Sequence, residues 1–247
     1  MTAEELQTES ALADKVKEFL TQYKDSTGSF SYVEQIDQMM PKHAKYIVVD
    51  FNDLVSVPLI ESKFVESPDE ILHAFSRAIK EILQERFPEY ARKIEHEIRA
   101  RIANFPAERS LRQINSEVIT KMISVSGMVV RASEVKPLAK EVTYKCLDKH
   151  ISVFTLLDGM SLNTSVKCQT PNCKHTNLAI IPEDSRFIDF QIVRLQELPE
   201  DLPPGQLPHY VNISMKQDLV DYARPGDRIV LTGIVRIEQE RVSGVKQ

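Results

Sequence analysis

The residues best suited to chemistry in this 247-residue sequence are three cysteines and a nearby histidine. Three residues separate Cys146 from His150, four separate Cys168 from Cys173, and seventeen lie between the two pairs. Zinc in structural sites takes four nitrogen or sulfur ligands in a tetrahedron, and two short pairs joined by a longer loop supply such a set. The spacing therefore predicts one structural Zn²⁺ ion bound by Cys146, His150, Cys168 and Cys173.

Two alternatives to this ligand set remain open. His175 lies only two residues after Cys173 and competes with His150 as the fourth ligand. The three cysteines could also be packed or exposed without binding a metal. A catalytic zinc is disfavoured, because three cysteines and one histidine fill the coordination shell and leave no position for water.

No motif of a catalytic centre accompanies the cysteines. The sequence contains no G-x-x-x-x-G-K-[ST] phosphate loop, no G-x-G-x-x-G turn and no G-x-S-x-G elbow. Carboxylates are plentiful but scattered. We therefore expect a binding module, with no catalytic residues in this stretch of chain.

Composition and charge bound the class of protein. The chain is 42% hydrophobic and 27% charged, as in ordinary globular proteins, and no apolar run approaches the roughly 20 residues of a membrane span. Its acidic, polar N-terminus lacks the basic and apolar regions of a signal peptide, so we expect a cytoplasmic location and no membrane partner. The net charge of -5 does not favour nucleic-acid binding by the whole chain. A local basic face is still allowed, because salt screens charges over about 8–10 Å.

The first hundred residues are predicted to be mainly helical. Ser67-Pro-Asp-Glu70 is typical of a helix start, with Ser67 as the cap and Glu70 completing a capping box. An apolar stripe at helical spacing follows: Ile71, Phe75, Ile79, Ile82 and Leu83. A further helix is expected from Pro88 through Ile102, and a strand at residues 46–51.

After about Phe105 the pattern changes to strands, at residues 123–130, 187–195, 209–215 and 228–237. Turn signals between them and glycines within them suggest a small closed β-barrel, which the cysteine segment would interrupt. The fold class expected is thus α+β. Phe190 is expected in the core rather than as a stacking platform. The sequence ends at Gln247 directly after a strand and a turn signal, so we expect it to be a piece of a larger protein.

Several segments occur together in a characteristic order. Val125-Ser-Gly-Met-Val-Val-Arg-Ala-Ser-Glu-Val-Lys-Pro137 precedes the cysteine cluster. After it come Phe187-Ile-Asp-Phe-Gln191, Leu195-Gln-Glu-Leu-Pro199, Pro204-Gly-Gln-Leu-Pro208 and Arg224-Pro-Gly-Asp-Arg-Ile-Val-Leu-Thr-Gly233. This ordered set resembles the N-terminal region of the minichromosome maintenance (MCM) replicative DNA helicases, of the archaeal type.

The resemblance implies a helical domain at residues 1–104 and an OB-fold barrel at residues 105–142 and 179–247. A zinc-binding insertion at residues 143–178 would interrupt the barrel. It also implies that chains form a hexamer or double hexamer around single- or double-stranded DNA in the nucleoid, with the zinc modules contributing to double-hexamer contacts. The loop at residues 197–208 resembles one that communicates with the motor. The ATPase motor itself, with ATP and Mg²⁺, is expected C-terminal to residue 247.

DNA contacts are expected from basic residues. Arg131 and Lys136 match the family position that contacts single-stranded DNA, and Arg186 and Arg194 bracket the second signature strand. A basic hairpin would project into the ring channel. The full predicted set is Arg131, Lys136, Arg186, Arg194, Arg236, Arg241 and Lys246. For each, the alternative is a solvated side chain or an ion pair. For the chain, the alternative is a zinc-containing protein-interaction adaptor without DNA binding.

Overall fold

The structure is a computed structural model that describes residues 3–25, 28–95, 97–106, 108–156, 166–176 and 178–237. It combines helices and sheet and divides into two compact units. The first unit comprises Met1–Ser126 with Val230–Arg236, and the second comprises Gly127–Ile229 with Ile237–Gln247. None of the helices formed by the described residues has the length and apolar character needed to cross a bilayer.

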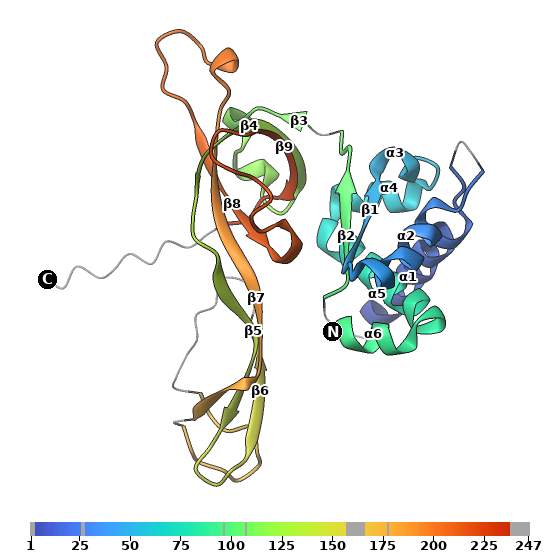
Figure 1. Ribbon diagram of the computed structural model, residues 1–247, viewed down its shortest axis with the longest axis vertical. Helices are drawn as coiled ribbons and strands as arrows, with labels where there is room; N and C mark the ends of the chain where they lie inside the picture. Colours follow the sequence, from blue (N-terminus) through green and yellow to red (C-terminus); the bar gives the residue numbers. More distant parts are fainter. Residues whose placement is uncertain are drawn as a thin grey trace, which may run out of the picture. The chain divides into compact units, whose positions relative to one another are not determined.

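The first unit is mainly helical, as predicted (Figure 1). Its helices are α1 (Ala3–Gln22), α2 (Ser31–Lys42), α3 (Phe51–Leu54), α4 (Pro58–Glu66), α5 (Pro68–Arg86) and α6 (Pro88–Ile94). Proline opens α4, α5 and α6, because its fixed φ suits the first helical position, where the missing N–H has no partner to lose. The predicted stripe of α5 is buried in the core against α1 and α4.

Two predictions in this unit were wrong. The helix that begins at Pro88 ends at Ile94, and strand β2 (Arg99–Ala103) follows, because β1 (Tyr46–Asp50) pairs with it in parallel and so satisfies its backbone hydrogen bonds. Helix α5 does begin at Pro68, but the side chain of Ser67 makes no capping hydrogen bond. The backbone N–H of Ser67 instead donates to Lys63 O and closes α4.

The remaining strands build a curled, OB-like half-barrel. They are β3 (Glu108–Arg109), β4 (Met122–Ala132), β5 (Lys136–Lys145), β6 (Ile151–Thr155), β7 (Ala179–Gln196), β8 (Tyr210–Lys216) and β9 (Arg228–Ile234). Their order is β3-β4-β7-β5-β6, with β8 added to β7 and β9 to β4. Short 3₁₀ turns occur at Leu111–Gln113, Ser116–Val118, Pro199–Asp201 and Gln217–Leu219. Pairings among the described residues leave this sheet open, whereas the sequence suggested a closed barrel.

Within the second unit, β5 and β7 pair antiparallel along a long twisted ribbon (Figure 1). β7 is 18 residues long, about twice the strand predicted at residues 187–195, because residues 179–190 pair with β5. β6 pairs with the other edge of β5, at the end of the ribbon remote from β8. The ribbon therefore carries the cysteine segment away from the curled part of the sheet.

Candidate metal centre and basic strand face

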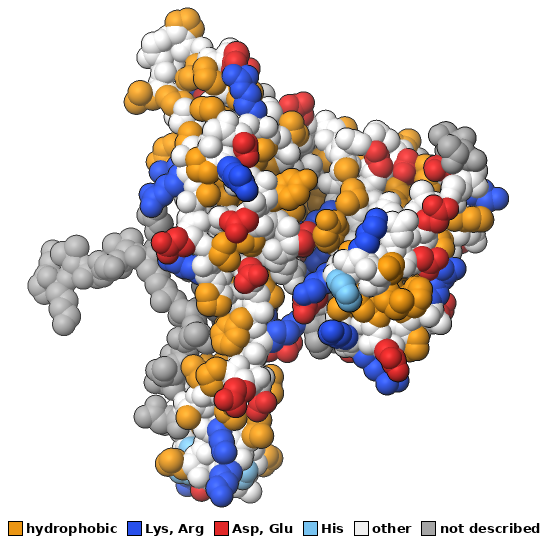
Figure 2. Space-filling model, viewed as in Figure 1, with side chains coloured by type: hydrophobic (Ala, Val, Ile, Leu, Met, Phe, Trp, Pro, Cys, Tyr) orange, Lys and Arg blue, Asp and Glu red, His pale blue; other side chains and the backbone are white. Residues whose placement is uncertain are grey.

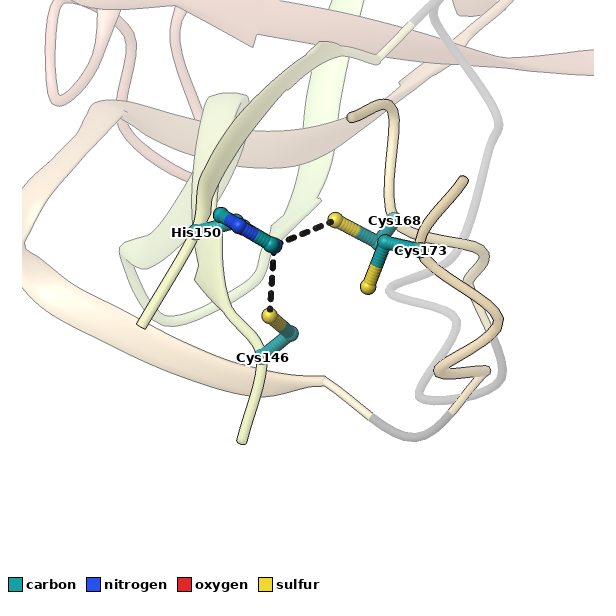
Figure 3. A group of neighbouring side chains, drawn as sticks. All are labelled: Cys146, His150, Cys168 and Cys173. Atoms are coloured by element: carbon teal, nitrogen blue, oxygen red, sulfur yellow. Dashed lines mark hydrogen bonds between the residues drawn. The ribbon is translucent and has the colours of Figure 1, made fainter. Parts of the chain in front are cut away.

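The structure brings Cys146, His150, Cys168 and Cys173 together at the end of the ribbon. Their four ligand atoms all lie within 4.8 Å of one another. The Nδ1 atom of His150 is 3.5 Å from Cys146 Sγ and 4.0 Å from Cys168 Sγ. Figure 3 shows the His150 ring pointing toward the sulfurs of Cys146 and Cys168, with Cys173 beside Cys168. A tetrahedral zinc with ordinary bond lengths separates its ligand atoms by about 3.6–3.8 Å, so the residues fit the ion.

A tight turn joins β5 to β6 and presents the first pair of ligands. Cys146 follows the last residue of β5, and His150 precedes the first residue of β6. The backbone N–H of Cys146 donates to His150 O at 3.1 Å, and the N–H of Lys149 donates to Cys146 O at 3.0 Å. Lys149 has a φ of 64°, in the left-handed region, which reverses the chain just before His150.

The second pair of ligands lies on a turn of similar design. The N–H of Cys168 donates to His175 O at 3.0 Å, and the N–H of Cys173 donates to Thr170 O at 3.2 Å. Asn172, directly before Cys173, has a φ of 69°. Asparagine tolerates this conformation better than most residues. In both turns a left-handed residue thus precedes the second ligand.

Hydrogen bonds around Cys168 favour its metal-binding form. The Thr170 side chain is the largest of the causes that lower the pKa of Cys168 to about 6, and Ser152 acts in the same direction. The buried Ser152 hydroxyl donates to Cys168 Sγ at 3.8 Å and accepts from the N–H of Gln169 at 3.1 Å. Because thiolates bind zinc, these contacts prepare Cys168 as a ligand at neutral pH.

His175 occupies a different position from the four clustered ligands. Its Nε2 atom lies 3.0 Å from Asp148 Oδ2. It forms a second, more exposed group with Asp148 and Cys173. A backbone N–H of His175 lowers the pKa of Cys173, but desolvation and the neighbouring thiols raise that pKa by more, so the net shift is upward.

Among the residues that the structure describes here, a small hydrophobic cluster supports this end of the ribbon. Val142, Tyr144 and Leu178 are its buried members apart from two cysteines, and Tyr144 meets Phe154 edge-on at 5.5 Å between ring centroids. A segment of this size buries too little apolar surface to be stable alone. Metal binding would supply the missing stability.

The second candidate site is an exposed strand face in the same unit. Along the end of β7, Gln191, Val193 and Leu195 are buried, and the side chains between them lie on the opposite face. Phe190, directly before Gln191, lies on the same side as these side chains and is partly buried. The core position predicted for Phe190 is thus reached only in part, because the alternation of β7 buries the other face more deeply.

Cross-strand register extends this face onto the neighbouring strands. Arg131 lies opposite Arg194, which lies opposite Asn212 on β8. Directly opposite residues in antiparallel strands share a face. We call this surface the outer face. The cross-strand register assigns its members to one side of the sheet. They are Arg131, Lys136, Phe190, Ile192, Arg194, Tyr210, Asn212, Ser214 and Lys216. Four of these residues are basic and none is acidic.

A buried glutamine holds the turn between Arg131 and Lys136. The Nε2 atom of Gln191 donates to Ser133 O at 2.9 Å and to Asp221 Oδ1 at 3.1 Å, and its Oε1 accepts from the N–H of Asp221 at 3.0 Å. These bonds connect β7 to two loops. They therefore position the two basic residues that flank the turn.

The other predicted DNA-binding residues lie elsewhere. Arg186 forms an ion pair with Glu141 at 3.0 Å. Arg236, in the first unit, forms an ion pair with Asp69 at the start of α5. Arg241 and Lys246 lie outside the described residues.

Sequence reasoning missed Tyr210 and Lys216 as members of the outer face. The alternation of residues 209–215 predicted Val211, Ile213 and Met215 on one face and so placed Tyr210 on the other. This alternation did not indicate which strand would pair with residues 209–215.

The curled sheet and its long ribbon define an OB-type protein. The MCM OB domain matches residues 110–239, and the MCM N-terminal domain matches residues 13–104. The first match covers more than half of the chain. The chain therefore belongs to the minichromosome maintenance family.

Individual relatives come from archaea and eukaryotes. The minichromosome maintenance protein MCM of Saccharolobus solfataricus is 32% identical over 90% of this chain and 33% of its own length. DNA replication licensing factor MCM4 of Drosophila melanogaster is 37% identical over 72% of this chain and 20% of its own length. MCM4 of Arabidopsis thaliana is 32% identical over 94% of this chain and 28% of its own length. The chain thus spans about a third or less of these relatives.

Proposed function

We propose that this chain is the DNA-binding and ring-assembly region of an MCM-type replicative helicase. The observation that carries the DNA-binding part is the outer face, where the register places the basic residues Arg131, Lys136, Arg194 and Lys216 on one side of the sheet. The ATP-dependent motor, with its ATP and Mg²⁺, belongs to the portion of such helicases that the chain does not cover. We also propose that this helicase is of the archaeal type, which the similarity to the Saccharolobus protein supports.

The mechanism of binding is electrostatic. OB-type sheets bind single strands through a basic surface that follows the phosphates, and duplex phosphates would be bound by the same charges. Arg131 is exposed, and its backbone is held by pairing with β7 beside Arg194, so only its side chain loses conformational freedom when it meets a phosphate. Binding is therefore expected to be independent of sequence and to weaken as salt is raised.

Replacing Arg131 by alanine tests this role. The variant Arg131→Ala removes one phosphate contact, so the affinity for a labelled single-stranded oligonucleotide falls and the slope of log K against log salt decreases by about 0.7. Fluorescence anisotropy over a salt series measures both quantities. Arg77→Ala is the matched control, because Arg77 lies on the surface of α5 in an ion pair with Glu81.

Equal affinities and slopes for Arg131→Ala, the control and the wild type would remove Arg131 from the site. If the wild-type chain binds neither single- nor double-stranded DNA, the DNA-binding proposal is wrong. The alternative of a protein-interaction adaptor would then be preferred.

We further propose a structural zinc ion at Cys146, His150, Cys168 and Cys173. The gathering of four sulfur and nitrogen ligand atoms within 4.8 Å of one another supports this assignment. Such an ion would hold the two turns together and take no part in a reaction, because its coordination shell is complete. Its role would be to present the end of the ribbon as a rigid surface.

That surface is the candidate contact between chains in a hexamer or double hexamer. Leu147, Ile151 and Val153 are 81%, 61% and 50% exposed, and the latter two lie on one face of β6. Figure 2 shows hydrophobic side chains, in orange, on the surface at this end of the ribbon. Exposed apolar side chains gathered at one place favour association with another protein surface.

Introducing a charge into this apolar surface should weaken self-association. Ile151→Asp is expected to shift the chain toward smaller species at a given concentration, since the buried contact would have to desolvate a carboxylate. Sedimentation velocity over a concentration series measures the shift. Val65→Asp, at an exposed position of α4, is the matched control. A distribution for Ile151→Asp that equals those of the control and the wild type contradicts the assignment.

A further inference from the structure

We infer that Tyr210 is a stacking platform for an unpaired base at the edge of the outer face. This inference rests on the proposed DNA binding and deepens it. It adds an aromatic contact to a surface that phosphate-binding residues would otherwise define alone.

The position of Tyr210 is fixed by backbone pairing. It is the first residue of β8 and lies opposite Gln196 of β7, two positions from the pair formed by Asn212 and Arg194. Residues two apart on a strand share a face, so Tyr210 lies on the same side of the sheet as Arg194. The ring is therefore placed next to the row in which Arg131 and Arg194 meet.

The environment of the ring is unusual for a tyrosine that only fills space. Its residue is 62% exposed, although aromatic side chains gain most from burial. The guanidinium carbon of Arg194 lies 4.6 Å from the ring centroid, and Arg194 Nε donates to Asn212 Oδ1 at 3.2 Å. Arg194 is thus held between Asn212 and one face of Tyr210. Because Arg194 covers one face of the ring, we place the base on the opposite face.

This arrangement suits one particular ligand chemistry. A base with a free π-face can stack on the exposed side of Tyr210, while the neighbouring phosphates meet Arg131 and Arg194. Bases inside a duplex are already stacked on each other, so the contact favours single strands. Every base has a π-face, so the contact tolerates any sequence.

The test compares a normal oligonucleotide with one that lacks bases. A labelled oligo-dT and an abasic oligonucleotide of the same length are titrated by anisotropy with wild type, Tyr210→Leu and Tyr210→Phe. Tyr210→Leu is expected to bind oligo-dT at least about fivefold more weakly and the abasic strand unchanged. Tyr210→Phe keeps the ring and is expected to bind both like the wild type. Unchanged zinc content and melting temperature would show that the variants are folded.

The other outcomes separate the two proposals. Equal losses for both oligonucleotides in Tyr210→Leu would mean that the tyrosine only orders Arg194, which overturns the stacking role. No loss for either also overturns it and leaves the phosphate contacts standing. Failure of the wild type to bind either oligonucleotide overturns the proposed function, and this inference with it.

Discussion

Replacing His150 by asparagine should release zinc from the chain, whereas the same replacement of His175 should leave one zinc ion bound. His150 Nδ1 lies 3.5 Å from Cys146 Sγ and 4.0 Å from Cys168 Sγ, while His175 interacts with Asp148. Structural zinc binding contributes apparently about 10–16 kcal/mol in small zinc peptides, so losing a ligand is expected to unfold the end of the ribbon. Metal analysis of the purified variants measures the first effect, and hydrogen exchange across residues 143–178 measures the second.

The two histidines serve as controls for each other, since they have the same chemistry and lie 25 residues apart in sequence. Loss of zinc in His175→Asn but not in His150→Asn would reassign the fourth ligand. A folded, unchelated wild-type preparation without zinc would contradict the metal site itself. The helical unit has its own core, so its protection from exchange should be unchanged in both variants.

Gly127→Ala should be strongly destabilising, because β4 lies too close to β7 at this point to leave room for a side chain. A Cβ atom there would lie 2.6 Å from the backbone oxygen of Gln196 and 2.7 Å from Leu195 Cγ. The backbone oxygen cannot rotate away as a side chain would, so the strands must separate. The expected cost is about 1–3 kcal/mol or more, measured as a lower denaturation midpoint and as faster exchange in β4 and β7.

Gly233→Ala is the matched control for this substitution. Gly233 also lies within a strand, but its added Cβ would meet only Leu231 Cδ2, at an ordinary 3.6 Å. Its effect on stability is expected to stay within about 0.5 kcal/mol. Equal effects of the two substitutions would show that the close approach of β4 and β7 at Gly127 does not affect stability. Arg131 and Arg194 lie on the same pair of strands, so Gly127→Ala should also lower DNA affinity.

Local sequence signals were sufficient to predict a helix, three candidate zinc ligands and the family of this protein. The proline at the first helical position predicted the start of α5, and the stripe from Ile71 to Leu83 predicted its buried side. Both features depend on residues that are neighbours in sequence. Residue type and spacing likewise singled out Cys146, Cys168 and Cys173 as candidate ligands. The order of segments from Val125 to Gly233 indicated the family, which matches of the N-terminal and OB domains then established.

Tertiary structure decided what depends on pairing between distant segments. The sequence left His150 and His175 as alternatives, and only the folding of two turns against each other places His150 among the three thiols. It predicted a helix through Ile102, where pairing with β1 makes a strand. The outer face is a matter of register: a shift of one residue would exchange Phe190 and Arg194 for Gln191 and Val193. That register joins Arg131, Arg194 and Tyr210, which lie on three strands and share no local signal.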